Sequence, residues 1–290
     1  MILLLILACK DKNEPSEKPE PLPDIPDIEI PVTESDVTEA QWSIETLQAQ
    51  FLAHAELGMP YGKPFMESYF ELLSLGDDTC PGSNIRLSPD NVDGCVASTG
   101  YAYYGLSVYH TIFEELDEVD MIDAEALDGW IVIGDFEMLT PENMSFQAGG
   151  HVSESLWLQD TGEYLLEGEI QGSWMWEGGE QNWVQYGISG LFFYQALQET
   201  DGSLEISLNG AIQWNGQSLA FDDVVLFSDQ PGFLGTVEMR DPSGLWHVVV
   251  SEQLSECAQH SYAGVLSEQP ICLDWSKHIE HFQRLMAEAR

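Results

Sequence analysis

Residues 204–214 read LEISLNGAIQW and residues 164–176 read YLLEGEIQGSWMW. In both stretches apolar side chains alternate with polar or small ones at a period of two. This period is typical of strands that bury one side and expose the other, as the strands of antiparallel sheets do. Four further stretches between Val96 and Tyr194 repeat the pattern, so the sequence predicts a mainly β fold.

The alternation also assigns the two sides of each predicted strand. In the first stretch, Val96, Ala102, Tyr104, Leu106 and Val108 are expected on the buried side. In the later stretches the buried side is expected to hold Trp130, Val132, Phe136, Met138, Met144, Phe146, Val152, Leu156, Leu158, Tyr164, Leu166, Ile170, Trp174, Trp176, Val184, Tyr186, Ile188, Phe192, Tyr194, Leu204, Ile206, Leu208, Ile212 and Trp214.

Turn signals such as Asp201-Gly202 and Asn215-Gly216 separate the stretches, and glycines inside them permit bulges and bends. We therefore predict a long, curved antiparallel meander, either an open sheet or a partial barrel. Helical spacing of apolar residues predicts two helices before it, over about 38–56 and 64–75, and one after it, over about 275–289. Flanking helices and a polar N-terminal segment argue against an outer-membrane barrel.

The charge of the chain excludes some partners. Its 290 residues include 50 acidic and 9 basic ones, a formal net charge of -41. Between Arg86 and Arg240 there are 27 acidic residues and no lysine or arginine. A protein that binds DNA or RNA needs such cations to displace counterions from phosphates, so nucleic acid is excluded as a partner. The same deficit argues against docking of the domain surface on anionic lipids.

The N-terminus carries the signature of export. Residues 1–9 read MILLLILAC, and Ile6-Leu7-Ala8-Cys9 resembles a bacterial lipobox, which implies acylation of Cys9. The eight residues before Cys9 include no basic residue, so we expect the start codon to lie upstream. Lys10, rather than aspartate, would imply sorting to the outer membrane or cell surface by the resemblance to this family. In its type the chain resembles the many uncharacterised acidic, disulfide-bearing envelope lipoproteins of Gram-negative bacteria.

The composition divides the chain into three parts. After the signal segment and lipobox of residues 1–9, residues 10–37 are rich in proline and charged side chains, which is typical of a disordered, extended tether. Residues 38–290 are expected to form one β-rich domain, with a capping-box pattern from Thr38 to Gln41 at its start.

The remaining four cysteines form two local pairs. With Cys9 assigned to lipid, we expect Cys80 to bond Cys95 and Cys257 to bond Cys272, out of three connectivities that four cysteines allow. The alternative, a zinc site, lacks any C-x-x-C spacing.

Metal ligands are weakly indicated. The acidic stretch 114–128 fits no EF-hand register, so a solvated loop is expected there. An irregular Ca²⁺ site built from Asp117, Asp120 and Asp123 is the alternative, and no other cofactor is indicated. His278 and His281 have the spacing of two ligands on one helix face, but we interpret them as surface histidines.

No catalytic motif is present either. Gly187-Ile188-Ser189-Gly190 is one residue short of a nucleophile elbow and lies in a predicted strand. His110, His151, His247 and His260 follow no motif.

Aromatic side chains on the solvent-facing parity are the strongest sign of a contact surface. If no second layer covers them, they would form an exposed strip suited to stacking on carbohydrate. They are Tyr101, Tyr103, Tyr109, Trp157, Trp183 and Phe193.

The sequence therefore favours a membrane-anchored envelope lipoprotein that presents a non-catalytic binding or structural domain. Its partner, beyond the membrane reached through the lipid, is a protein, a glycan or a hydrophobic ligand. The alternatives are a carrier that cradles a hydrophobic ligand against the curved sheet and, less favoured, a secreted hydrolase.

Overall fold

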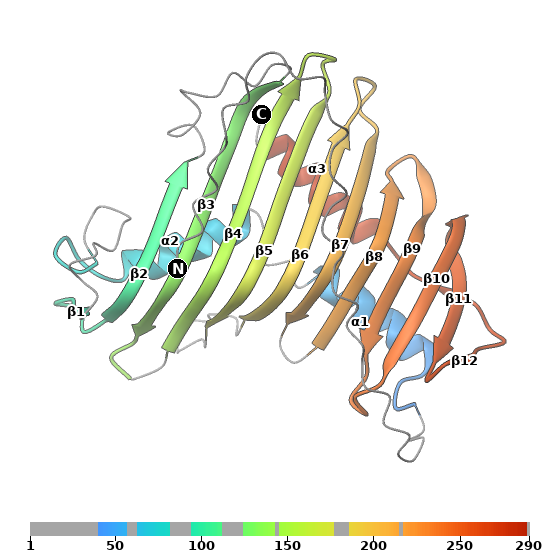
Figure 1. Ribbon diagram of the computed structural model, residues 1–290, viewed down its shortest axis with the longest axis horizontal. Helices are drawn as coiled ribbons and strands as arrows, with labels where there is room; N and C mark the ends of the chain where they lie inside the picture. Colours follow the sequence, from blue (N-terminus) through green and yellow to red (C-terminus); the bar gives the residue numbers. More distant parts are fainter. Residues whose placement is uncertain are drawn as a thin grey trace, which may run out of the picture. The chain divides into compact units, whose positions relative to one another are not determined.

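The strands form one antiparallel sheet in which each strand pairs with the next along the chain (Figure 1). Within the described residues the sheet has 13 strands in the order β1 to β12, with β13 paired to β11. No pairing joins β1 to β12 in this part of the chain, so the predicted meander takes its open form. The computed structural model describes residues 40–56, 63–81, 94–111, 124–142, 145–176, 186–214 and 217–288.

The mainly β fold is confirmed, and the strands between Ala102 and Trp214 lie where the alternation predicts them, whereas the strands after Trp214 fall beyond the predicted stretches. In chain order they are β1 (Cys95–Val96), β2 (Ala102–Thr111), β3 (Ala124–Leu139), β4 (Ser145–Gln159), β5 (Tyr164–Trp176), β6 (Tyr186–Gln198), β7 (Leu204–Trp214), β8 (Gln217–Phe227), β9 (Gln230–Arg240), β10 (Trp246–Ser255), β11 (Cys257–Tyr262), β12 (Val265–Leu266) and β13 (Ile271–Cys272).

Three helices lie against one face of this sheet, behind it in Figure 1. They are α1 (Ile44–Glu56), α2 (Lys63–Ser74) and α3 (Ser276–Glu288). Helix α1 begins at Ile44 rather than at the predicted Thr38. Its cap is Ser43, whose Oγ accepts a hydrogen bond from the Thr46 amide at 3.3 Å.

The core lies between the helices and the buried side of the strands. The alternation identifies this side correctly from β3 to β7, where Val132, Val152, Ile170 and Ile206 are fully buried. Phe51 of α1 packs on Trp275, just before α3, with ring centroids 4.7 Å apart. Burial of this many apolar side chains is the main stabilising contribution to the fold.

In β2, Ala102 is buried as predicted, but the prediction for Tyr104 is wrong, because Tyr103 of the opposite parity faces the core; the side chains of Leu106 and Val108 lie outside the described residues. Tyr103 is fully buried, whereas Tyr104 is 38% exposed and Val96 is 65% exposed. Tyr103 pairs directly with the buried Met138 of β3, and residues directly opposite in an antiparallel pair share a face. The Tyr103 hydroxyl donates to the Leu72 carbonyl oxygen at 2.9 Å, so the tyrosine joins β2 to the end of α2.

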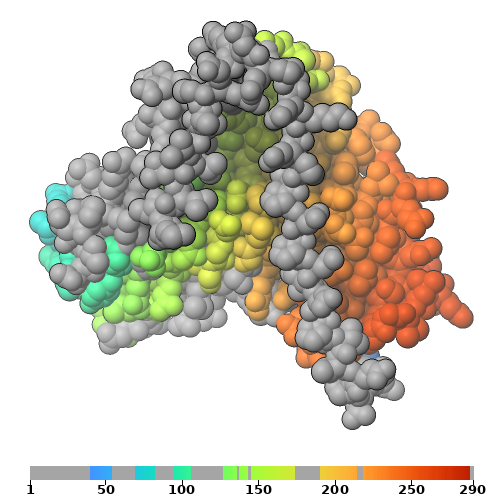
Figure 2. Space-filling view, viewed as in Figure 1, coloured from blue at the N-terminus to red at the C-terminus, as the bar shows by residue number. Residues whose placement is uncertain are grey.

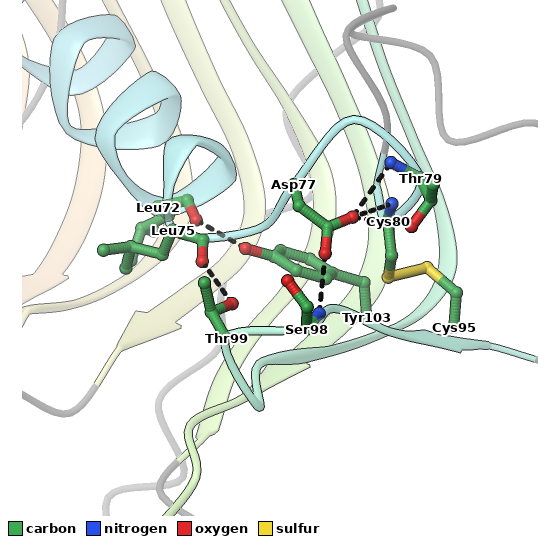
Figure 3. Close-up of a disulfide and its surroundings, with 9 residues drawn as sticks. All are labelled: Leu72, Leu75, Asp77, Thr79, Cys80, Cys95, Ser98, Thr99 and Tyr103. Carbon is green, nitrogen blue, oxygen red and sulfur yellow. Dashed lines mark hydrogen bonds between the residues drawn. A yellow bond between two sulfur atoms is a disulfide. The ribbon is translucent and has the colours of Figure 1, made fainter.

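The first disulfide closes a corner next to this tyrosine (Figure 3). Cys80 bonds Cys95, as predicted. Asp77 accepts hydrogen bonds from the amides of Thr79, Cys80 and Ser98. The Thr79 hydroxyl also donates to Asp77, at 2.6 Å. This bond makes the largest contribution, and with the bonds from Ser98 and the Thr79 amide it holds the pKa of Asp77 well below its usual range. The corner thus joins the residues that follow α2 to those that precede β2.

The second predicted disulfide is also present and lies at the other end of the sheet. Cys257 of β11 bonds Cys272 of β13, and the two residues are direct partners in the sheet. Because β13 leads within four residues to α3, this bond fixes the start of the C-terminal helix. Helix α3 matches its predicted position.

A row of glycines crosses the centre of the sheet. Gly134, Gly150, Gly172 and Gly190 are direct partners on β3, β4, β5 and β6. Gly172 has a φ of +101°, and a Cβ there would lie 2.0 Å from the Gly149 carbonyl oxygen. Only glycine fits this conformation and this close approach of backbone atoms. Along the row, backbone atoms of the neighbouring strand therefore occupy the space that a side chain would need.

Candidate functional site

The face of the sheet opposite the helices carries the candidate site. We call it the open face; Figure 2 views the molecule from this side, and in the same view in Figure 1 the helices lie behind the sheet. Its centre is a depression of about 460 Å³ across β4, β5, β6 and β7. The strands that form it are rigid elements, so the side chains that line it are held in fixed relative positions.

Two rows of directly paired residues line this central depression. The first row consists of Ser155, Glu167, Gln195 and Ser207. The second row consists of Ser153, Glu169, Phe193 and Asn209. Hydroxyls, carboxylates and amides therefore surround one phenyl ring, that of Phe193, which is 41% exposed.

A second depression repeats this chemistry nearer the first edge of the sheet. Its volume is about 430 Å³, and it extends across β2, β3, β4 and β5. Tyr104, Glu137 and Gln147 are direct partners along one row. Asp135, Gly149 and Ser173 form the next row. An exposed aromatic ring again lies beside a carboxylate and an amide.

Carboxamide and imidazole groups, rather than lysine or arginine, contact Glu137, Glu167 and Glu169 in the two depressions. Gln195 donates to Glu167 at 2.9 Å, and Gln147 donates to Glu137 at 3.3 Å. Glu169 lies 3.1 Å from Nε2 of His151. These three carboxylates are thus oriented by their partners and keep acceptor capacity for a ligand. Because β2 to β8 contain no lysine or arginine, the surface strongly disfavours anions.

The open face is also acidic towards the second edge of the sheet. Burial, followed by the nearby charge of Asp222, raises the pKa of Glu238 above its usual range. Within the described lengths of β9 and β10, Arg240 is the only lysine or arginine. The Arg240 Nε donates to the Gly244 carbonyl oxygen at 3.0 Å, within its own turn.

The predicted aromatic strip is partly correct. Phe193 is exposed and Trp157 is half-buried, its Nε1 donating to Ser155 Oγ at 3.0 Å. Tyr103 does not belong to the strip, because it is a core residue, and Tyr101 is half-buried against the core. Trp183 and the side chain of Tyr109 lie outside the described residues. Tyr104, which the sequence pattern placed in the core, is instead an exposed aromatic residue of the open face.

A buried polar cluster on the helix-covered face was not predicted. Asp241 Oδ2 lies 3.2 Å from Nε2 of His247, and Nδ1 of His247 lies 3.0 Å from Nε2 of His260. Because the carboxylate only accepts, neutral His247 donates to it and accepts from His260. Burial lowers the pKa of both histidines below the usual range, and the charge of His247 adds to the effect on His260. Tyr262 packs on His247 with ring centroids 4.4 Å apart.

The carboxylate in this cluster is ionised. Burial opposes ionisation of Asp241, but hydrogen bonds from Ser243, from the Gln41 amide and from His247 outweigh it and hold its pKa below the usual range. Among the described residues no serine or cysteine side chain is hydrogen bonded to His247 or His260, and the Ser243 hydroxyl bonds instead to Asp241 and to Tyr262. The arrangement is therefore that of a structural network.

The remaining predicted ligands are placed as follows. His278 and His281 are buried in α3, so the interpretation as surface histidines is wrong. Burial, with a smaller contribution from the charge of Arg284, lowers the pKa of His281 to about 4. Cys9, Asp117, Asp120 and Asp123 lie outside the described residues, and the side chain of Ser189 does too. In the part of the chain that is described, no group of three or more His, Cys, Asp or Glu residues can hold a metal ion.

Comparison with protein families, with curated proteins and with solved structures finds no match. Among the helices of the described segments, none has the length and apolarity needed to cross a membrane. The two disulfides indicate an oxidising compartment outside the cytoplasm. The site is therefore interpreted from its own geometry.

Proposed function

We propose that this chain is an exported protein, anchored to the envelope by lipid on Cys9, which displays a non-catalytic binding domain. In this proposal the open face of the sheet is the binding surface. One observation carries it: two depressions of matching composition lie on the same face, on rigid strands, while the other face serves as the core.

Support for the anchor comes from the sequence and the disulfides. The lipobox-like Ile6-Leu7-Ala8-Cys9, followed by a segment rich in proline and charge, is the arrangement of a lipid-anchored domain on a tether. Sorting to the outer membrane or cell surface belongs to the same proposal. Disulfides at both ends of the sheet agree with export.

The carrier is the second candidate function and has less support. A carrier needs apolar surface that a ligand can reach, but Leu166, Phe192 and Ile212 are buried on the helix-covered side of the sheet. Tyr194 on this side packs on Phe282 of α3 with ring centroids 5.7 Å apart. Both described depressions lie instead on the polar face.

Binding of three probes to the full-length protein tests the proposal. The probes are neutral oligosaccharides, oligolysine and a fluorescent fatty acid. A double variant, Glu167→Ala with Phe193→Ala, removes two side chains of the central depression. Leu191→Ala is the matched control, since Leu191 is on the same strand and face, is 38% exposed and does not line either depression.

We expect a polar probe to bind and the double variant, but not the control, to lose it. Binding of the fatty acid alone, unchanged by the double variant, would favour the carrier, and binding of no probe would contradict the proposed function. Metabolic labelling with an alkyne fatty acid tests the anchor separately, with Cys9→Ala expected to abolish the label.

A further inference from the structure

We infer that the open face binds a neutral oligosaccharide, in two subsites centred on Phe193 and on Tyr104. This inference rests on the proposed function, because it names the ligand class of the same surface. It depends on a constellation that occurs twice, in which an exposed aromatic ring lies beside a carboxylate and a carboxamide that are hydrogen bonded to each other.

The two subsites share the same three parts. At the first, Phe193 is the direct partner of Glu169 on the neighbouring strand, and the hydrogen-bonded pair Glu167 and Gln195 lies in the next row. At the second, Tyr104 is the direct partner of Glu137, which in turn is the direct partner of Gln147. Gly94 leaves room for the Tyr104 ring, since a Cβ at that position would lie 2.2 Å from Tyr104 Cδ1.

The aromatic ring and the carboxylate–carboxamide pair suit different groups of a pyranose ring. The C–H bonds on one face of the ring stack on an aromatic ring, and the equatorial hydroxyls both donate and accept in one plane. A carboxylate accepts from two adjacent hydroxyls and a carboxamide both donates and accepts, so a fixed pair of the two suits a vicinal diol. Because Gln195 and Gln147 already hold the carboxylates, little conformational entropy is lost when the sugar binds.

The spacing of the subsites favours a chain of sugars over a single one. Neighbouring strands lie about 4.8 Å apart, which is close to the length that one pyranose unit adds to an extended oligosaccharide. The central depression extends across four strands, β4 to β7, or about 14 Å. A chain that crosses the strands would place successive units over successive strands. The second depression extends to β2, but its Tyr104 row meets β4 at Gln147, six positions from Ser153 of the Phe193 row, so a chain that reaches both subsites lies oblique to the strands.

The charge of the surface selects neutral ligands against anionic ones. With no lysine or arginine in β2 to β8, a sulfated or uronic acid polymer would be repelled by Glu137, Glu167 and Glu169. A cationic peptide would be attracted to these carboxylates, but it has no use for the aromatic ring beside each carboxylate–amide pair. A neutral oligosaccharide uses both parts.

Titration calorimetry with the full-length protein tests the inference. The probes are neutral hexasaccharides built from glucose, mannose, galactose or N-acetylglucosamine, with a uronic acid hexamer and hexalysine in parallel. We expect at least one neutral chain to bind, with an affinity that sodium chloride leaves unchanged, because no ion pair is formed. Phe193→Ala and Tyr104→Ala should each weaken it about tenfold and the two together more, whereas Leu191→Ala should leave it unchanged.

Each other result is informative. Binding of hexalysine alone, weakened by salt and by Glu167→Gln, would overturn the oligosaccharide but leave the open face as the binding surface. Equal losses in Leu191→Ala and Phe193→Ala would overturn the stacking role of the ring. No binding of any probe would overturn the inference and the proposed function together. All three replaced side chains are exposed, so unchanged melting temperatures are expected to show that the variants fold.

Discussion

The backbone amide of Gln41 donates a hydrogen bond to Oδ2 of Asp241 at 3.0 Å, although the two residues are 200 positions apart in the chain. The same carboxylate oxygen lies 3.2 Å from His247 Nε2. Asp241 thus joins the segment that enters α1 to the turn between β9 and β10. Trp42 stacks over His247 with ring centroids 6.3 Å apart, which extends the contact.

Replacement of Asp241 is therefore expected to destabilise the domain. Asp241→Ala removes the acceptor of several buried donors, and loss of a buried hydrogen-bonding partner costs about 2–4 kcal/mol in the free energy of unfolding. Urea unfolding of the two proteins measures the difference. Asp229→Ala, in an exposed turn, is the control and should change the free energy by less than about 0.5 kcal/mol. An equal effect of both variants would contradict the account of this network.

The stability of the domain should decrease as the solution is acidified. The folded protein holds the pKa of His247, His260 and His281 below the value of 6.5 that applies on unfolding. Between the two values the unfolded chain binds more protons, so stability present near neutral pH is lost as the pH falls below about 6.5. For His281 the loss continues down to its folded pKa of about 4.

Thermal melts from about pH 7 to about pH 5 measure this dependence. We expect the melting temperature to fall on acidification, and to fall less in His260→Gln, which cannot be protonated. Asp241, the carboxylate that contacts His247, has a pKa below its usual range and so stays ionised between these pH values. A melting temperature that rises between these pH values would contradict the burial of neutral histidines.

The central glycines provide a test of the sheet geometry. Gly172→Ala places a Cβ 2.0 Å from the Gly149 carbonyl oxygen, on a residue whose φ is +101°. We therefore expect the free energy of unfolding to fall by more than about 3 kcal/mol, or the protein not to fold. Gly149→Ala is the matched control, because a Cβ there meets no atom within 4 Å and its φ is ordinary. Denaturant unfolding should separate them clearly. Equal tolerance of both changes would refute the direct pairing of Gly150 with Gly172.

The buried pair of Tyr194 and Glu154 gives a test of the core. The Tyr194 hydroxyl donates to Glu154 Oε2 at 2.6 Å, and both residues are buried. Tyr194→Phe removes this bond and should cost about 1–3 kcal/mol in the free energy of unfolding. Tyr104→Phe, on the open face, should cost less than about 0.5 kcal/mol. A larger loss at Tyr104 would mean that the two faces have been assigned the wrong way round.

The sequence predicts the sheet because alternation is a local property of each strand. Val152, Ile170 and Ile206 lie on the predicted side, since each is flanked by polar residues that leave one choice of face. The prediction fails in β2, where Ala102 and Tyr103 are both buried. Three tyrosines in positions 101–104 suit either face, because a phenol has an apolar ring and a polar end.

Features that depend on register or on distant pairing could not be predicted. The glycine row and the two rows of the central depression exist only in the observed pairing of β3 to β7. The contact of Gln41 with Asp241 leaves no local trace in the sequence. The burial of His278 had a local signal that was not used: it precedes Phe282 by four residues and so shares the apolar face of α3.

The proposed binding function requires above all that the open face is accessible in the full-length protein. Hydroxyl-radical footprinting with mass spectrometry can compare Phe192 with Phe193, neighbours in β6 that face opposite sides of the sheet and are 1% and 41% exposed. We predict rapid oxidation of Phe193 and strong protection of Phe192. Equal protection of the two rings would mean that the proposed binding surface is covered, and it would contradict the account.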